Sequence, residues 1–182
     1  MGTEHMSKSS PEAAPEKATD GQSSSHRYLL FNIGGQLFGT LLRHVREIVT
    51  PVPTKPIPST VPHFLGVINL RGKIIGILDL RVLFAAEPLI TEKLAFVIFD
   101  TDDGPLGAVV DSVESVTTIE EAATERNPTI ATRIPLNYLV GIGHVGNKLV
   151  SIINLRRILS DEELTKMQIQ GPDQPPIGNK SA

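Results

Sequence analysis

Residues 66–81 read GVINLRGKIIGILDLR and residues 141–156 read GIGHVGNKLVSIINLR, so the second stretch repeats much of the first. In each of them, two runs rich in Val, Ile and Leu flank a short polar break, which is typical of two strands joined by a tight turn. The stretches align without a gap at an offset of 75 residues, and the alignment continues to residue 84 in the first and residue 159 in the second. This duplication predicts that one β-hairpin unit occurs twice in the chain.

A second pair of hairpins is predicted, one ahead of each of these two. Their strands cover residues 28–33, 36–42, 94–99 and 106–110. The first two strands are separated by Gly34 and Gly35, which favour a hairpin because such turns require positive φ. From residue 38 onward this hairpin region matches the chain from residue 106 onward at an offset of 68, so that Val45 corresponds to Val113.

These matches predict an all-β protein with two pseudo-duplicated lobes, at about residues 27–86 and 93–160. Each lobe would contain a hairpin, a linker, a second hairpin and a short helix. A strand-rich unit of about 60 residues is marginally stable alone, so we expect the two lobes to share a core. Closing the short strands into barrels would also remove exposed sheet edges.

The expected helices are short. Asp79 and Asn154 stand where a strand ends and a Leu-Arg pair begins, and both residue types are good helix N-caps. Ser160 and Glu163 have the spacing of a capping box, which predicts a helix at the C-terminal end of the folded region.

Both ends of the chain differ from its middle in composition. Residues 1–26 and 169–182 are rich in polar residues and proline and contain few large apolar side chains. Such segments bury too little apolar surface to offset the entropy of ordering. We therefore expect two disordered tails around one folded domain at residues 27–168.

Charge and composition exclude several classes of protein. The net charge of −3, from 17 basic and 20 acidic residues, argues against a nucleic-acid or anionic-lipid partner. The sequence has no apolar run of about 18 residues, so we expect no membrane insertion. It has no cysteine, which excludes disulfides and thiolate metal sites and fits a reducing cytoplasm.

The chain lacks the residue patterns of a catalyst. His44, His63 and His144 are scattered without metal-ligand spacing, and the acidic turn at 100–104 lacks the distal glutamate of a calcium loop. There is also no nucleophile motif and no phosphate-binding glycine motif. We therefore expect no enzymatic activity, no metal and no cofactor, and the sequence favours a binding module.

Two features allow more than one interpretation. The linker at residues 50–62 carries five prolines, which predict a stiff extended connection or, alternatively, a ligand for a proline-binding domain. Arg71 at the tip of the 66–81 hairpin is either a solvated turn residue or a contact for a partner.

Several motifs, taken in this order and spacing, give the chain a specific resemblance. They are YLLF at 28–31, FG at 38–39, VREI at 45–48, GVINLRG at 66–72, ILDLR at 77–81, LGAVVDSV at 106–113 and YLVGIG at 138–143. With them the sequence resembles the CheW family of chemotaxis coupling proteins over residues 28–165. The resemblance implies two SH3-like, five-stranded β-barrels around a shared core.

The same resemblance implies a non-catalytic cytoplasmic adaptor that is recruited to membrane receptor arrays. It would be a monomer when isolated and would couple the cytoplasmic tips of methyl-accepting chemoreceptors to the regulatory domain of the histidine kinase CheA in two-component signalling. By matching positions, the implied receptor contacts are Val45, Glu47, Ile48 and Val113. The implied coupling motif contains Gly66, Asn69, Arg71 and Gly72.

Two alternatives remain open. One is an adaptor of a chemotaxis-like system that controls pili or development, which sequence does not distinguish from the first function. The other is a small-molecule-binding β-barrel protein, which would require a concave site with perturbed ionisable groups.

The duplication also predicts a docking strip. Val45 and Val113 are equivalent in the two halves, and Ile48 and Val116 follow them at the same spacing. We expect these four residues to form a paired, partly buried apolar strip that receives the tip of a helical hairpin. The alternative is that all four are core residues.

Overall fold

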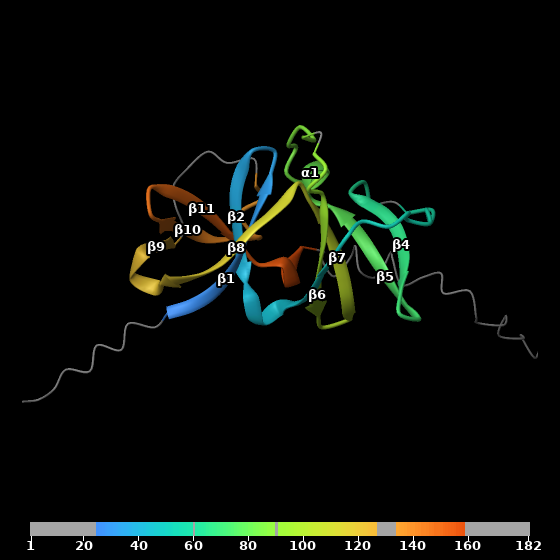
Figure 1. Ribbon diagram of the computed structural model, residues 1–182, viewed down its shortest axis with the longest axis horizontal. Helices are drawn as coiled ribbons and strands as arrows, with labels where there is room; N and C mark the ends of the chain where they lie inside the picture. The colour runs from blue at the N-terminus through green and yellow to red at the C-terminus, as the bar shows by residue number, and fades with distance from the viewer. Residues whose placement is uncertain (1–24, 60, 90, 127–133, 159–182) are drawn as a thin grey trace, which may run out of the picture.

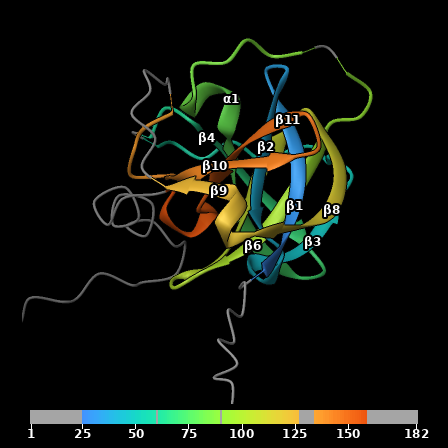
Figure 2. The same ribbon diagram turned by 90° about the vertical axis from the view of Figure 1, so that its left-hand side faces the viewer.

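The computed structural model describes residues 25–59, 61–89, 91–126 and 134–158. Most of both predicted tails and the predicted capping box at Ser160 and Glu163 lie outside these residues. The described chain forms two β units side by side along the long axis of the molecule (Figure 1). Figure 2 views one unit from its end, with β9, β10 and β11 toward the reader.

The two units are built from two sheets. In spatial order the first sheet contains β8 (Ser112–Glu120), β1 (Ser25–Ile33), β2 (Gln36–Leu41), β11 (Lys148–Ile153), β10 (Leu139–Val145) and β9 (Thr124–Arg126). The second contains β3 (Val45–Val49), β6 (Ala95–Thr101), β7 (Gly104–Val110), β5 (Lys73–Asp79) and β4 (Phe64–Leu70). The helical turns are η1 (Leu42–His44), α1 (Leu80–Leu83), η2 (Glu121–Ala123) and η3 (Leu155–Arg157).

All four predicted hairpins are present, but the predicted division into one lobe per half of the chain is wrong. The β1–β2 hairpin of the first half pairs with β8 and β11 of the second half. The β6–β7 hairpin of the second half pairs with β3 and β5 of the first half. The two halves have thus exchanged their first hairpins. The sequence pattern specifies each local hairpin, whereas the neighbour that a hairpin pairs with is a non-local property.

The duplication nevertheless determines the architecture. Replacing β8, β1, β2, β11 and β10 by their repeat equivalents β3, β6, β7, β5 and β4 converts the order of the first sheet into that of the second. Individual side-chain contacts also recur at equivalent positions of the two barrels. Arg46 on β3 forms an ion pair with Asp100 on β6 at 2.6 Å, and the equivalent Glu114 on β8 accepts a hydrogen bond from Asn32 on β1.

Each sheet closes into a barrel because the chain that leaves one edge returns to the other. After β3, the backbone of Lys55 exchanges hydrogen bonds of 2.8 and 2.9 Å with Val67 on β4. After β8 and η2, Arg126 on β9 pairs with Gly141 on β10. The sixth strand of the first sheet, β9, is thus the continuation of β8, which agrees with the expected five-stranded barrels.

The crossing of the linker requires a glycine in each barrel. A Cβ on Gly66 would lie 2.3 Å from the backbone oxygen of Lys55, and Gly66 also has a φ of +128°. A Cβ on Gly141, its repeat equivalent, would lie 2.5 Å from the backbone oxygen of Glu125. Both repeats therefore require glycine at this position, because a side chain would collide with the crossing backbone.

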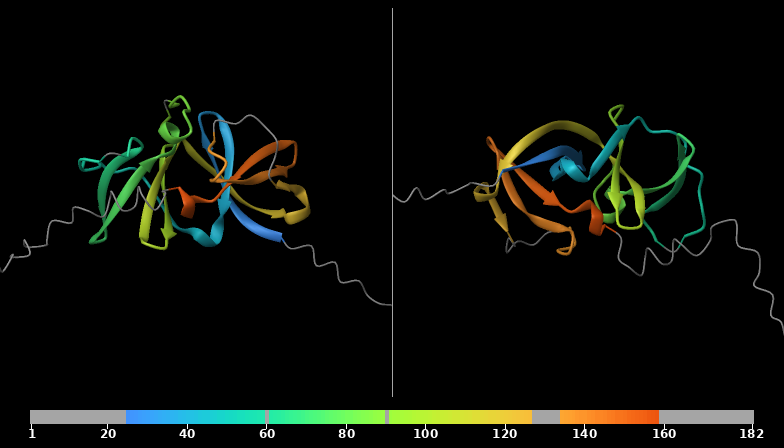
Figure 3. Two further views of the ribbon diagram at one scale, coloured as in Figure 1. Left: turned by 180° about the vertical axis from the view of Figure 1, so that it is seen from behind. Right: turned by 90° about the horizontal axis from the view of Figure 1, so that it is seen from below.

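The predicted shared core is confirmed. One cluster fills each barrel: Ile68, Ile75, Ile77, Phe96, Ile98 and Val109 in the second, and Tyr28, Leu30, Ile119, Val150 and Ile152 in the first. A larger cluster joins the barrels and includes Phe31, Phe38 and Phe84, whose rings stack at centroid distances of 6.2 and 5.3 Å. The turn η3 contacts β6 of the second barrel and lies between the barrels in both views of Figure 3.

The local end signals of the helices are correct. The side chain of Asp79 accepts a hydrogen bond from the backbone N–H of Arg81 at 2.9 Å, and Asn154 accepts one from Arg156 at 3.1 Å. The N-terminal boundary differs slightly, because β1 begins at Ser25 and not at residue 27. Ser25 and His26 extend the strand through backbone pairing with β8, which requires no apolar side chain.

A charged network is buried beside α1. The guanidinium of Arg81 binds the carboxylate of Asp79 through two hydrogen bonds of 2.9 and 2.7 Å. It also lies 3.5 Å from the carboxylate of Asp111, which is buried and accepts a 2.6 Å hydrogen bond from the backbone of Gly34. Hydrogen bonding to Asp79 raises the pKa of Arg81 above its ordinary value, although burial opposes this. The network connects strands from both barrels.

Candidate interaction surfaces

The tip of the β4–β5 hairpin presents Arg71 to solvent. Arg71 and Gly72 form the turn, with φ values of +52° and +84°. Asn69 stabilises this conformation, because its side-chain oxygen accepts a 2.8 Å hydrogen bond from the backbone N–H of Gly72. The Arg71 side chain is 77% exposed. Three residues of the expected coupling motif therefore belong to one small turn.

The structure brings Arg71 together with Glu47. The family resemblance had assigned Glu47 to the receptor contacts and Arg71 to the coupling motif. The two guanidinium nitrogens of Arg71 lie 2.9 and 3.2 Å from the two carboxylate oxygens of Glu47. Glu47 is on β3 and Arg71 follows β4, and these are the two edge strands of the second sheet. The pair therefore spans the closure of the barrel.

The four residues of the predicted strip lie on two equivalent edge strands. Val45 on β3 is opposite Phe99, and Val113 on β8 is opposite the equivalent Phe31. Both valines are partly buried and pack against the shared core. Ile48 and Val116 are 44% and 42% exposed. The side chains thus divide into two that contact the core and two that remain available at the surface.

Gly66 does not belong to the exposed tip. It is buried under the Lys55 backbone, as described above, and its conformation is fixed by that crossing. Within the expected coupling motif, Gly66 therefore maintains the shape of the hairpin and presents no side chain to a partner.

A further set of exposed apolar residues was missed at the sequence level. Leu65 and Ile74 lie on the outer face of β4–β5, and the repeat equivalents Val140 and Leu149 lie on that of β10–β11. Ile74 and Leu149 are 65% and 60% exposed. The two faces are at opposite ends of the molecule in Figure 1. Strand alternation combined with the 75-residue offset was the signal that could have found them.

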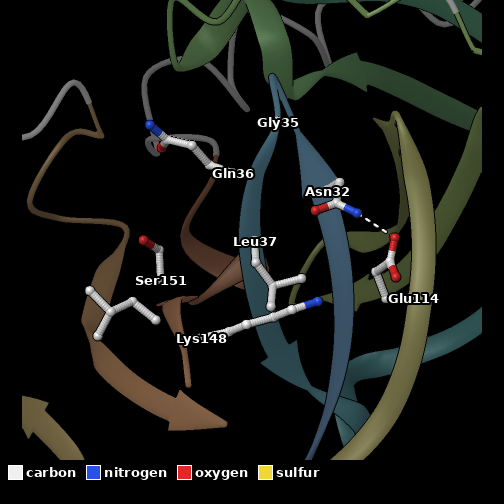
Figure 4. Close-up of a pocket in the computed structure, with 8 residues that line it drawn as sticks. Asn32, Gly35, Gln36, Leu37, Glu114, Lys148 and Ser151 are labelled. Atoms are coloured by element: carbon white, nitrogen blue, oxygen red, sulfur yellow. Dashed lines mark hydrogen bonds between the residues drawn. The ribbon is translucent and has the colours of Figure 1, made fainter. Parts of the chain in front are cut away.

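A recess of about 480 Å³ borders the β10–β11 face (Figure 4). Its lining residues are Asn32, Gly35, Gln36, Leu37, Glu114, Lys148, Leu149 and Ser151. The side chain of Lys148 extends past Leu37 toward β1. The recess gives this end of the molecule a mixed polar and apolar surface, as is usual for the edge of a protein interface.

The described residues contain no cluster of side chains arranged as a metal site. No group of three or more His, Asp or Glu side chains within this part of the chain is arranged to hold a metal ion. The acidic residues 100–104 form the β6–β7 turn, as the missing distal glutamate indicated. No helix in the described ranges is long and apolar enough to cross a membrane.

Paired β-barrels with exposed apolar edges and end faces define a protein-interaction module. A family model described as "CheW-like domain" matches residues 27–163. The chain belongs to this CheW-like family, as its sequence motifs indicated.

Individual relatives and a solved structure agree with this family assignment. The chemotaxis protein CheW of Klebsiella aerogenes is 29% identical over 145 residues, which cover 79% of this chain and 87% of that protein. CheW of Bacillus subtilis is 27% identical, with 83% and 96% covered. The crystal structure of the scaffolding protein TtCheW from Thermoanaerobacter tengcongensis matches with a TM-score of 0.69 and 29% identity, over 74% of this chain and 92% of that one. Together these similarities support a role as a chemotaxis coupling adaptor.

Proposed function

We propose that the protein is a non-catalytic cytoplasmic adaptor that couples methyl-accepting chemoreceptors to the regulatory domain of the chemotaxis histidine kinase. The observation that carries the proposal is the presence of separate exposed apolar surfaces, one along the edge strands and one at each end. A coupling protein needs distinct surfaces for distinct partners, whereas a catalyst needs a clustered polar site.

The receptor surface would lie along the edge strands. Ile48 offers an exposed apolar anchor, and Glu47 on the same strand offers a carboxylate to a basic partner residue. Val45 and Val113 would line the base of the contact from the two barrels. An apolar strip bounded by charge suits the amphipathic tip of a helical hairpin.

The kinase surface would lie on the β4–β5 hairpin. Ile74 and Leu65 supply apolar area there, and Arg71 at the tip supplies up to five hydrogen-bond donors. Asn69, Gly66 and Gly72 would fix the shape of this hairpin, as argued above. The kinase's regulatory domain, which the family resemblance expects to share this fold, would present a similar outer face, and apolar faces of like shape pack well together.

Reciprocal loss of partners tests the proposal. Ile48→Asp should abolish binding of a receptor-tip fragment and spare the kinase regulatory domain, whereas Ile74→Asp should have the opposite effect. Both residues are exposed, so each variant should keep the melting temperature of the wild type. Val52→Asp in the linker, where Val52 is exposed to a similar degree as Ile48, is the matched control.

The measurement is surface plasmon resonance with each partner separately, together with circular dichroism melting. If each exposed substitution removed both partners from a folded protein, or removed neither, the assignment of separate surfaces would be wrong. Recruitment to membrane receptor arrays follows from the same proposal, and fluorescence microscopy of Ile48→Asp should show loss of polar clusters.

A further inference from the structure

The first barrel has a pocket at one end that belongs to neither proposed surface. Its volume is about 420 Å³, within the range of small-molecule sites, and mouths of β-barrels are frequent places for such sites. Apolar side chains in the pocket come from β1, β2, β10 and β11. They are Tyr28, Leu41, Leu139, Val140, Ile152 and Ile153.

The polar side chains of this pocket are basic or neutral. They are Arg43, His44, Arg126, Asn137, Asn154 and Arg157. Among the residues that the structure describes, no carboxylate lines the pocket. Arg126 has an ion-pair partner in Glu121. Within the described part of the chain, Arg43 and Arg157 form no ion pair with an acidic residue.

The equivalent position in the second barrel contains two carboxylates that the first barrel lacks. At the 68-residue offset Arg43 corresponds to Asp111, and at the 75-residue offset Asn154 corresponds to Asp79. There the two carboxylates surround Arg81 and neutralise it inside the protein. In the first barrel both acids are absent, and Arg156, the equivalent of Arg81, pairs with Asp102 instead.

The electrostatics at the pocket agree with a positive charge that no described acidic residue neutralises. The pKa of His44 is lowered by its burial and further by Arg43 and Arg156. Burial raises the pKa of Tyr28, while Arg43 and Arg126 act in the opposite direction on its hydroxyl. These guanidinium groups therefore act on the interior of the pocket as well as on solvent.

We propose that this pocket binds a small amphipathic anion, a carboxylate or phosphate group on an apolar body. The anion would take the place of the internal carboxylates that the second barrel retains. Arg43 and Arg157 would donate charge-assisted hydrogen bonds to the head group, and Leu41, Leu139 and Ile152 would contact the apolar body. The site is independent of the two partner surfaces and adds a small-molecule ligand to the adaptor.

The probes are hexanoate and hexyl phosphate, with hexylammonium as the cation of similar length. Isothermal titration with the full chain should show saturable 1:1 binding of at least one anion and none of the cation. The anion that binds tighter identifies the head group. In ¹H–¹⁵N spectra of the wild type, the largest shift changes should occur at Tyr28, Leu41 and Leu139.

Variants test the two arginines. Arg43→Gln and Arg157→Gln should each weaken anion binding about tenfold or more, because each removes a charge-assisted hydrogen bond. Arg43→Asp, which introduces the acid found at the equivalent Asp111, should abolish binding. Lys73→Gln, an exposed residue of the second barrel, is the charge-matched control and should bind like the wild type.

Several results would overturn the proposal. They are absence of saturable anion binding to the wild type, equal binding of hexylammonium, and shift changes outside the pocket. Equal loss of affinity in Lys73→Gln would also contradict it, because binding would then follow net charge and not the pocket. Since all these measurements omit receptor and kinase, failure here would leave the adaptor proposal untouched.

Discussion

Arg71 and Glu47 join the two edges of the second barrel through a two-pronged ion pair, with N–O distances of 2.9 and 3.2 Å. Arg71 is largely exposed, whereas Glu47 is mostly covered. Exposed pairs contribute between 0 and about 1 kcal/mol to stability, so this one holds the barrel closed only weakly. It therefore places the Glu47 carboxylate of the proposed receptor surface next to the Arg71 guanidinium of the proposed kinase surface.

Replacing Arg71 should therefore cost little stability. For Arg71→Gly we expect the free energy of unfolding to stay within about 1 kcal/mol of the wild type, because loss of the ion pair is offset by relief of a positive φ in a non-glycine residue. Urea denaturation measures this. A loss of several kcal/mol would show that Arg71 is structural, whereas loss of kinase binding at unchanged stability would agree with the proposed surface. Arg71→Glu, which reverses the charge, should reduce coupling more strongly by repulsion.

Gly66 and Gly72 should respond differently to the same added methyl group. A Cβ at Gly66 meets the Lys55 backbone, which a substitution must displace, whereas a Cβ at Gly72 meets nothing within 4 Å. Both have positive φ, so both alanine variants carry backbone strain of about 1–3 kcal/mol. Gly66→Ala should lose clearly more than Gly72→Ala in urea denaturation. Equal losses would mean that the linker crossing is easily moved.

Asp111 should be important for stability. Asp111→Ala leaves the backbone N–H of Gly34 without its acceptor and removes one of two carboxylates beside Arg81, which is mostly buried. Breaking such a buried pair costs about 3 kcal/mol or more. Asp111→Asn is the control, since an amide oxygen still accepts the bond from Gly34. It should lose distinctly less in chemical denaturation, and a loss equal to that of alanine would assign the effect to charge alone.

His44 should give stability a dependence on pH near neutrality. Its pKa in the folded protein is lowered below 6.5, first by burial and then by Arg43 and Arg156. As the pH falls through 6.5, the unfolded chain takes up this proton before the native protein does. His44 therefore contributes stability above the unfolded-state pKa, and that contribution is lost at lower pH.

An NMR titration of the His44 ring checks the direction of this shift. Arg43→Gln should move the pKa of His44 upward, toward its ordinary value, because it removes one nearby positive charge. A midpoint above 6.5 in the wild type would contradict the prediction.

The sequence predicted the hairpins well because both strands of each hairpin lie within about 15 residues of one another. It did not predict the exchange of hairpins, since the pairing of Leu29 with Val116 joins residues that no local pattern connects. The internal repeat nevertheless predicted part of the strand arrangement. The 68-residue offset correctly predicted that Val45 and Val113 occupy equivalent places, and the structure puts them on the edge strands β3 and β8.

The candidate site was predicted in part for similar reasons. Arg71 at an exposed tip follows from a polar break between two apolar runs. Its partnership with Glu47 depends on closure of the barrel, which is a tertiary property. Asp111 looked like an ordinary polar residue at a strand end. Only the contrast with Arg43 at the equivalent position marks both residues as unusual.

The exchange of hairpins affects how the protein folds during its synthesis on the ribosome. The β1–β2 hairpin emerges first, but its neighbours β8 and β11 are encoded some 80 to 110 residues later. At ordinary elongation rates of about 5–20 residues per second, both strand edges of this hairpin remain unpaired for on the order of ten seconds. During that time they are open to wrong pairing. The second barrel needs only β3 to β7, which end at Val110, whereas the first barrel also needs β8, β10 and β11. We therefore expect protease resistance to appear in two steps, the later one once residue 153 has left the exit tunnel.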